Sequence, residues 1–247
     1  MAAQRRWTRA EQLLALELYL SLPFGRLHRT APEVVAVAKE IDRTPSSVAM
    51  KACNFASLDE SFTSSGRAGL EGASAADRAL WQEFLHDRDR LVEEMETRVL
   101  AAPPVEVTLQ RPEGPTEVTR SVRQRRRQAF FARVVRAAYA ESCAVTGLAV
   151  ASLNVASHII PWAENEARRT DPCNGLLLSA LVDRAFDRGL VAFDERSRLV
   201  CAKRLKEPTA AASALVSLEG TTLRAPEKFH PDPSALAWHR ERWAENF

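Results

Sequence analysis

The stretch VASHIIPWAENEARRTDPCNGLLLSALVDRAFDRGLVAFD, residues 155–194, decides the fold of the C-terminal half of the chain. It starts as extended chain after a turn at Gly147, passes through a polar segment, and continues into the apolar run NGLLLSA (174–180). Short apolar runs next to turn residues are typical of strands. The segment SALVDRAFD (179–187) has the spacing of a short amphipathic helix. The stretch therefore predicts strand, loop, strand and helix, in that order.

An arginine-rich helix is expected before this stretch, from about Val122 to Ser142, because apolar residues recur along it. After the stretch, GLVAFD (189–194) and RLVCAKR (198–204) indicate a terminal hairpin, and PSALAWHRERWAENF (233–247) indicates a closing helix. Arginines cluster in and just before the expected helix and predict a positive surface, with a solvated helix face as the alternative. They are Arg120, Arg123, Arg125, Arg126, Arg127, Arg133 and Arg136.

Three helices are predicted near the N-terminus. TRAEQLLALELYLSL (8–22) opens with Thr8 and Glu11 in the spacing of a capping box. A second helix should run over about 32–41, and a third should begin with Thr44 as its cap and Pro45 in its first turn. Three short helices with a tight turn between the last two are typical of a helix-turn-helix.

The third helix has two different faces. Its apolar residues Val48, Ala52 and Phe55 recur at helical spacing and should pack inward. The polar face could enter the major groove of DNA, because such side chains pair with base edges and phosphates. A solvent-exposed face without a partner is the alternative. The polar face consists of Ser47, Lys51 and Asn54.

The rest of the N-terminal half predicts a loop, a helix and a linker. SLDESFTSSGRAGLEGAS (57–74) is rich in glycine and serine and is expected to form a loop or a wing. One long helix should run from about Ser74 to Val99, and the four prolines after it indicate a linker. We therefore expect a helical domain over residues 1–100, a linker over 101–119 and a second domain over 120–247.

Composition excludes several classes of protein. The net charge of +2 says little about a polyanionic partner. The four cysteines are widely spaced and form no CxxC pair, so neither a zinc ribbon nor a disulfide framework is expected. No apolar signal segment or run long enough to span a membrane occurs, and a cytoplasmic protein is expected.

Three motifs carry a resemblance to a known family. CAVTG (143–147), ASHIIPW (156–162) and NGLLLSALVDRAFDRGL (174–190) resemble the HNH endonucleases. The resemblance implies a ββα-metal fold for the C-terminal domain, and hence an α+β chain with an all-α N-terminal domain. RTPSSVAMKACNFASLD (43–59) is, more loosely, similar to a domain that precedes such nuclease cores in bacterial restriction-like proteins, including modification-dependent ones.

The resemblance assigns roles that suit phosphodiester hydrolysis. A histidine can deprotonate water near neutral pH, and His158 is the expected general base. Asn174 would orient that histidine, fix the loop, or help to hold a metal ion. A divalent cation, Mg²⁺ or another such as Mn²⁺, would stabilise charge at the phosphate.

The family normally supplies a metal ligand from a histidine that aligns here with Val182, which has no lone pair to donate. Asp183 and Asp187 are the nearby carboxylates, but Asp183 is turned by about 100 degrees from position 182 on a helix. Three explanations stay open: deliberate inactivation, natural decay to a binding protein, or a metal held differently. Because the rest of the motif is intact, a recent or deliberate change is the favoured one, and it would make the chain an inactive variant.

The expected function is cleavage of double-stranded DNA by a bacterial restriction enzyme, with sensing of methylated bases as one form. Phosphate contacts are expected from Arg123, Arg125, Arg126 and Arg127. A homodimer is a simple way to cut both strands. The alternatives are a non-catalytic DNA-binding protein that reads modified bases or acts as a repressor, and a toxin-like nuclease acting on RNA or on any DNA.

Overall fold

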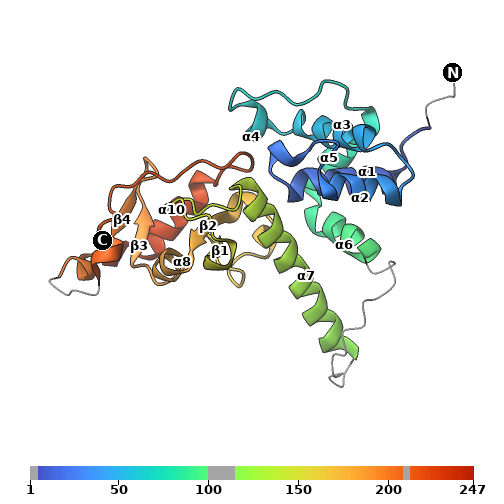
Figure 1. Cartoon of the computed structure of the whole chain (residues 1–247). Helices are drawn as coiled ribbons and strands as arrows, with labels where there is room; N and C mark the ends of the chain where they lie inside the picture. Colours follow the sequence, from blue (N-terminus) through green and yellow to red (C-terminus); the bar gives the residue numbers. More distant parts are fainter. Residues whose placement is uncertain (1–4, 100–114, 208–211) are drawn as a thin grey trace. The chain divides into compact units, whose positions relative to one another are not determined.

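The computed structural model describes residues 5–99, 115–207 and 212–247, and the chain divides into two compact units, Met1–Phe130 and Phe131–Phe247 (Figure 1). The boundary lies inside one continuous helix, α7 (Pro115–Ala138). The second unit starts eleven residues later than the domain start expected at 120, and its buried side chains begin on this helix with Phe131. Most of the linker expected over 101–119 lies outside the described residues.

Helix α1 (Arg9–Ser21) is the centre of the first unit. It begins with the predicted capping box, in which the Thr8 and Glu11 side chains each bond the other residue's backbone N–H. Its side chains are buried on nearly every side, because four other helices contact it. Figure 1 shows three of them, α2, α3 and α5, around α1. The four helices are α2 (Pro32–Glu40), α3 (Pro45–Ala56), α5 (Ala75–His86) and α6 (Arg88–Val99).

The long helix expected from Ser74 to Val99 is two helices. The chain leaves the helical conformation at Asp87, which has φ −135° and ψ 51° and ends α5. The break lets each half turn an apolar side toward the core: Trp81 and Phe84 are buried on α5, and Leu91 is buried on α6. The prediction of one continuous helix was therefore wrong. Helical spacing of apolar residues on both sides of Asp87 does not reveal that the chain changes direction there.

The segment between α3 and α5 contains a short helix, α4 (Glu60–Thr63). No strand occurs in the described residues of the first unit, so the wing considered from the sequence is not formed there as a β-hairpin. Gly69 lies so close to the end of α3 that a Cβ atom there would be 2.2 Å from the Ser57 nitrogen. The loop therefore packs tightly against α3.

A buried ion pair joins α3 to α5. The Lys51 ammonium donates to the Asp77 carboxylate at 2.8 Å, and Gln12 donates to its other oxygen at 2.7 Å. Burial opposes ionisation of Asp77, but the hydrogen bonds from Lys51, Ser74 and Gln12 hold its pKa below the usual value. Lys51 also lies over the Trp7 ring. The expectation that Lys51 lies on an exposed face was wrong, because Asp77 draws the ammonium inward.

The second unit is built on two small antiparallel hairpins. β1 (Asn154–His158) pairs with β2 (Gly175–Ser179), and the register places His158 opposite Gly175. Helix α8 (Ala180–Asp187) follows β2 directly and contacts both strands. The sequence predicted this order of strand, loop, strand and helix. The second hairpin consists of β3 (Val191–Phe193) and β4 (Leu199–Cys201), and the helices α9 (Ser213–Val216) and α10 (Pro233–Arg242) complete the unit.

Gly175 allows α7 to approach the first hairpin closely. A Cβ atom at this position would lie 2.4 Å from a Val135 methyl carbon and 2.9 Å from the Phe131 ring. Only a glycine lets both side chains cover the start of β2. In the described residues, no helix combines the length and the apolarity needed to cross a bilayer.

A second histidine packs in the core of this unit. The His239 ring stacks on Phe186 at a centroid distance of 3.6 Å, and its Nε2 donates to the Phe186 carbonyl at 3.0 Å. Its Nδ1 is buried without a hydrogen-bond partner. Burial, with a smaller effect of Arg242, lowers the pKa of His239 to about 4.

We predict that Lys51→Met destabilises the first unit by about 3 kcal/mol, because it leaves the Asp77 charge buried without its cation. Arg26→Met is the matched control, since Arg26 pairs with Glu33 at 2.7 Å on the surface, with side chains 51% and 38% exposed. That loss should stay below about 1 kcal/mol. Urea denaturation measures both, and equal losses would contradict the buried role of Lys51.

We also predict an acid-sensitive contribution from His239. Its pKa is about 4 in the folded chain, and an unfolded histidine has a pKa near 6.5, so the unfolded state binds more protons between these values. Stability from this group is therefore complete above pH 6.5 and is lost as the pH falls toward 4. The loss of unfolding free energy between pH 7 and 4.5 should be about 2.5 kcal/mol smaller in His239→Gln. An unchanged pH dependence would contradict this assignment.

Candidate active site

His158 lies at the end of β1 and is half-buried. Its ring stacks on Phe131 from α7, with centroids 3.6 Å apart and planes within 12°. The Trp162 ring meets it edge-on at 5.6 Å. Two aromatic contacts in different directions leave the imidazole little freedom to rotate.

A backbone carbonyl decides which ring nitrogen of His158 carries the proton. Nε2 lies 3.0 Å from the carbonyl oxygen of Arg169. Because a carbonyl can only accept, Nε2 must be the N–H donor, and the neutral ring keeps its lone pair on Nδ1. Among the described residues, no group forms a hydrogen bond with Nδ1. Burial lowers the pKa of His158, although the Arg169 carbonyl opposes this, so the neutral form is favoured.

Asn174 fixes the loop that carries this carbonyl. Its Oδ1 accepts from the Ile160 N–H at 2.8 Å, and its Nδ2 donates to the carbonyls of Ile160 at 3.0 Å and Arg168 at 3.3 Å. The side chain is 1% exposed and does not bond the His158 ring. Of the three roles considered from the sequence, this geometry matches loop fixing.

Helix α8 turns Val182 and Asp183 in different directions. Val182 is 0% exposed and packs in the core with Ala185 and Phe186. Asp183 is half-buried, and its carboxylate lies beside the Ser157 hydroxyl of β1. The sequence reasoning assumed that position 182 faces the site and that Asp183 could replace it only if the helix shifted. In the structure, the Asp183 carboxylate already lies beside Ser157 of β1 without any shift of the helix, and Val182 is buried.

The carboxylates of Asp183 and Asp187 form an acidic patch with the Ser157 hydroxyl. Burial raises the pKa of Asp183, and burial together with the Asp183 charge raises the pKa of Asp187. Ser157 Oγ is buried and has no hydrogen bond of standard geometry. A cation would relieve the repulsion between the two carboxylates.

This donor set fits a hard divalent cation. In the described part of the chain, no group of three or more His, Cys, Asp or Glu side chains could hold a metal ion. Zinc sites need such a group, whereas Mg²⁺ is commonly held by one or two carboxylates, with substrate phosphates and water completing its shell. Asp183, Asp187 and Ser157 would be its protein ligands.

Two arginine side chains, Arg184 and Arg188, lie near these carboxylates, and the sequence analysis did not identify them as site residues. Arg184 and Arg188 are exposed on α8 and lie close enough to Asp187 to act on its pKa. Their i, i+4 spacing, the same as that of Asp183 and Asp187, was a usable signal for a shared helix face. They lie where phosphate oxygens of a substrate would be attracted.

The expected DNA-reading face of α3 is less polar than the sequence indicated. Lys51 is held by Asp77, and the Asn54 amide, oriented to satisfy its hydrogen bonds, donates to the Met50 carbonyl at 3.2 Å and to the Leu70 carbonyl of the following loop at 3.3 Å. Ser47 is half-buried, and Met50, which is 58% exposed, shares the outer surface of the helix. Ser47 and Asn54 remain candidates for contact with DNA.

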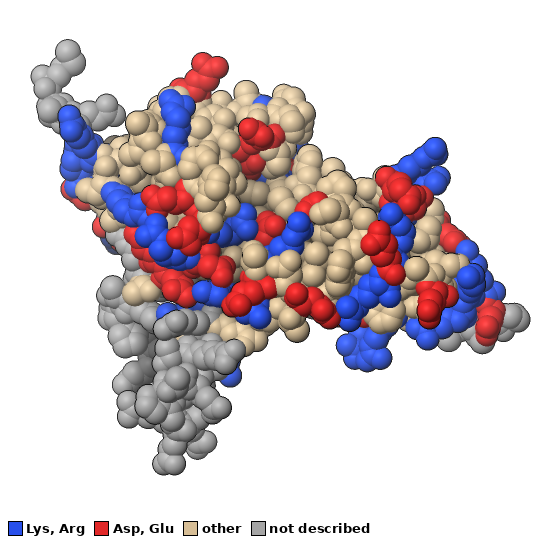
Figure 2. Space-filling model, turned by 180° about the vertical axis from the view of Figure 1, so that it is seen from behind, with Lys and Arg blue, Asp and Glu red and all other residues tan. Residues whose placement is uncertain are grey.

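The arginine cluster is only partly available for phosphates. Arg127 forms ion pairs with Asp89 and Glu93, both at 2.8 Å. Arg125 is exposed and Arg126 is half-buried, while the side chain of Arg123 lies outside the described residues. Figure 2 shows basic and acidic side chains interspersed on the face turned to the viewer, without one continuous basic surface.

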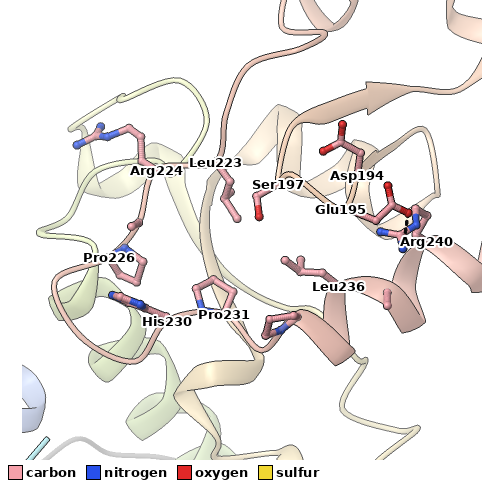
Figure 3. Close-up of a pocket in the computed structure, with 13 residues that line it drawn as sticks. Asp194, Glu195, Ser197, Leu223, Arg224, Pro226, His230, Pro231, Leu236 and Arg240 are labelled. Atoms are coloured by element: carbon pink, nitrogen blue, oxygen red, sulfur yellow. Dashed lines mark ion pairs between the residues drawn. The ribbon is translucent and has the colours of Figure 1, made fainter. Parts of the chain in front are cut away.

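A cavity of about 480 Å³ lies elsewhere in the second unit, between the turn after β3, the segment 223–226 and the start of α10 (Figure 3). Its charged lining includes Glu195 and Arg240, which form an ion pair with each other at 3.0 Å. None of the site residues expected from the sequence lines this cavity.

Comparison with known proteins agrees with the site built above. No curated protein matches the chain. Residues 143–194 match the family model described as HNH endonuclease, and this segment contains β1, β2 and α8 together with His158, Asn174 and Asp183. The chain thus carries an HNH endonuclease domain in its C-terminal unit.

Proposed function

We propose that this chain is a metal-dependent endonuclease that hydrolyses phosphodiester bonds in DNA, with His158 as the general base. The observation that carries the proposal is the hydrogen bond from His158 Nε2 to the Arg169 carbonyl at 3.0 Å. Because Nε2 carries the proton in this bond, the lone pair of the neutral ring lies on Nδ1, where it can accept a proton. The HNH match supplies the reaction class.

Side chains of β1 and α8 would have separate roles in hydrolysis. A water molecule that attacks the phosphorus would form the new P–O bond and give its proton to Nδ1, while the bond between phosphorus and the leaving sugar oxygen breaks and that oxygen takes a proton from solvent. The imidazolium formed would keep its Nε2–H bond to the Arg169 carbonyl until it returns its proton to solvent. Arg184 and Arg188 would attract the phosphate. Asp183, Asp187 and Ser157 would hold a divalent cation, Mg²⁺ or Mn²⁺. When bound, that cation supplies Lewis-acid stabilisation of negative charge on the phosphate.

Val182 does not by itself imply an inactive chain. Its side chain is 0% exposed, so a histidine at this position would begin inside the core. Asp183 offers a carboxylate toward β1 from the next position. We therefore favour the third explanation considered from the sequence, a metal held differently, over deliberate inactivation or natural decay.

We further propose double-stranded DNA as the substrate and a restriction role, including recognition of a modified base, for the two-unit chain. Support comes from the resemblance of residues 43–59 and from a helical unit that precedes the HNH domain. Ser47 and Asn54 would contact bases, and Arg123, Arg125 and Arg126 would contact phosphates. A homodimer would provide two active sites for the two strands.

We predict that His158→Ala lowers the rate of nicking of supercoiled plasmid by about 100-fold or more, because general-base catalysis contributes on this order. Mg²⁺ or Mn²⁺ should be required, and a chelator should stop the reaction. His230→Ala is the control, since His230 is an exposed histidine of the same unit outside the site. Wild-type rates in His158→Ala would remove this histidine from the reaction.

We predict opposite outcomes for the two neighbouring positions of α8. Asp183→Asn should lower the nicking rate by about 100-fold, with partial recovery at high Mn²⁺, because one carboxylate ligand is lost. Val182→His should not raise the rate and should destabilise the unit by about 2 kcal/mol, since it buries a polar ring. A strong gain of activity in Val182→His, with none lost in Asp183→Asn, would return the metal ligand to position 182.

A further inference from the structure

The loop of residues 159–174 holds the carbonyl on which His158 depends. It connects β1 to β2 and contains only short 3-10 turns, at Glu166–Arg168 and Pro172–Asn174. Connections of this length rarely keep one shape without outside anchors. A shift of the Arg169 carbonyl by about 1 Å would break its bond to His158 Nε2. The anchors of this loop therefore matter for the tautomer of the ring.

Asn174 supplies the anchors within the hairpin. It bonds Ile160 at one end of the loop and the Arg168 carbonyl near the middle, and its own carbonyl accepts from the Ile159 N–H at 2.9 Å. The Arg169 side chain is held within the loop, by the Trp162 carbonyl at 3.0 Å and by Glu166 at 2.9 Å. The Arg168 side chain is held from outside the loop.

The N-terminus of α10 supplies the second set of anchors, more than sixty residues later in the sequence. The Asp232 carboxylate accepts from Arg168 at 2.5 Å through one oxygen and from the Ser234 N–H at 2.8 Å through the other, which caps α10. The Asp232 N–H donates to the Cys173 carbonyl at 2.8 Å. Asp232 thus bonds the loop at two points, Arg168 and Cys173, which flank the Arg169 carbonyl in the sequence.

The ion pair is a restraint and not a loose surface contact. The two side chains are 26% and 27% exposed, and the second terminal nitrogen of Arg168, Nη1, is buried without a partner. Burial opposes ionisation of Asp232, but the bonds from Ser234 and Arg168 lower its pKa, so the carboxylate is charged. A second pair from α10 to the loop, Arg242 with Glu164, is 40% and 42% exposed and should restrain less.

We propose that Asp232 is a positioning residue for His158. Through Arg168 it holds the neighbouring Arg169 carbonyl, and that carbonyl keeps the ring proton on Nε2 and the lone pair on Nδ1. The inference rests on the proposed function for its effect on hydrolysis, but the restraint on the ring can be observed without any reaction.

The test compares Asp232→Asn with Glu195→Gln. Asn is a good N-cap, so Asp232→Asn keeps an acceptor for the Ser234 N–H and removes the charge that faces Arg168. Glu195 pairs with Arg240 of the same helix at 3.0 Å, outside the loop, and Figure 3 marks this pair with a dashed line. Both variants change one ion-paired carboxylate to an amide beside α10, and the Glu195 side chain, which is 80% exposed, has no bond to the loop.

Plasmid nicking under Mn²⁺ gives the first readout. Asp232→Asn and Arg168→Gln should each lower kcat about tenfold and leave KM within about twofold, because substrate contacts are unchanged and the base is misplaced. The double variant should be no slower than either single one, and Arg168→Lys should recover part of the rate. Glu195→Gln should match the wild type. An unchanged kcat in Asp232→Asn, or an equal loss in Glu195→Gln, overturns the proposal.

Nitrogen-15 NMR of the imidazole gives the second readout, on the full chain without DNA or metal. The wild type should show His158 as the Nε2–H tautomer, and Asp232→Asn should show a mixture, with Glu195→Gln as the reference. If the wild type cleaves nothing, the proposed function fails and this spectrum still decides the role of Asp232. A pure Nε2–H tautomer in Asp232→Asn, with the variant folded, overturns the proposal.

Discussion

The hydrogen bond from His158 Nε2 to the Arg169 carbonyl is the interaction on which the site depends. Without it, the half-buried ring could place its proton on either nitrogen, and the proposed reaction would have no defined proton acceptor. The bond also depends on other residues that hold the Arg169 carbonyl in place. Asn174 must fix the loop, and the start of α10 must hold Arg168. A single proton position is thus supported by residues from two hairpin strands, a loop and a terminal helix.

Packing around the same ring explains residues that take no part in chemistry. Phe131 can stack on His158 only because the strand partner of this histidine, Gly175, has no Cβ to meet the phenyl ring. The buried Val182 also has a packing role, because it is one of the apolar side chains that α8 contributes to the core. A histidine in place of Val182 would therefore change packing and chemistry together, while the neighbouring Asp183 already offers a polar group toward β1.

Local patterns in the sequence predicted the parts of the fold that local forces determine. The caps at Thr8 and Thr44, and the order of β1, β2 and α8, follow from spacing and turn chemistry. Features set by distant partners were missed: Asp77 draws Lys51 inward, and Asp232 reaches Arg168 from the far end of the unit. The direction of Asp183 was also missed, because the phase of a short helix depends on which residues the hairpin buries.

The second unit contains two histidine rings that each stack on a phenylalanine, and their environments can be compared directly. His158 on Phe131 and His239 on Phe186 share a centroid distance of 3.6 Å and a bond from Nε2 to a carbonyl. Their burial differs: His239 is 4% exposed with its Nδ1 enclosed in the core, whereas His158 is half-buried. The same pair of contacts can therefore hold a histidine entirely inside the core or at its edge, and only at the edge could the second ring nitrogen exchange a proton with a substrate water.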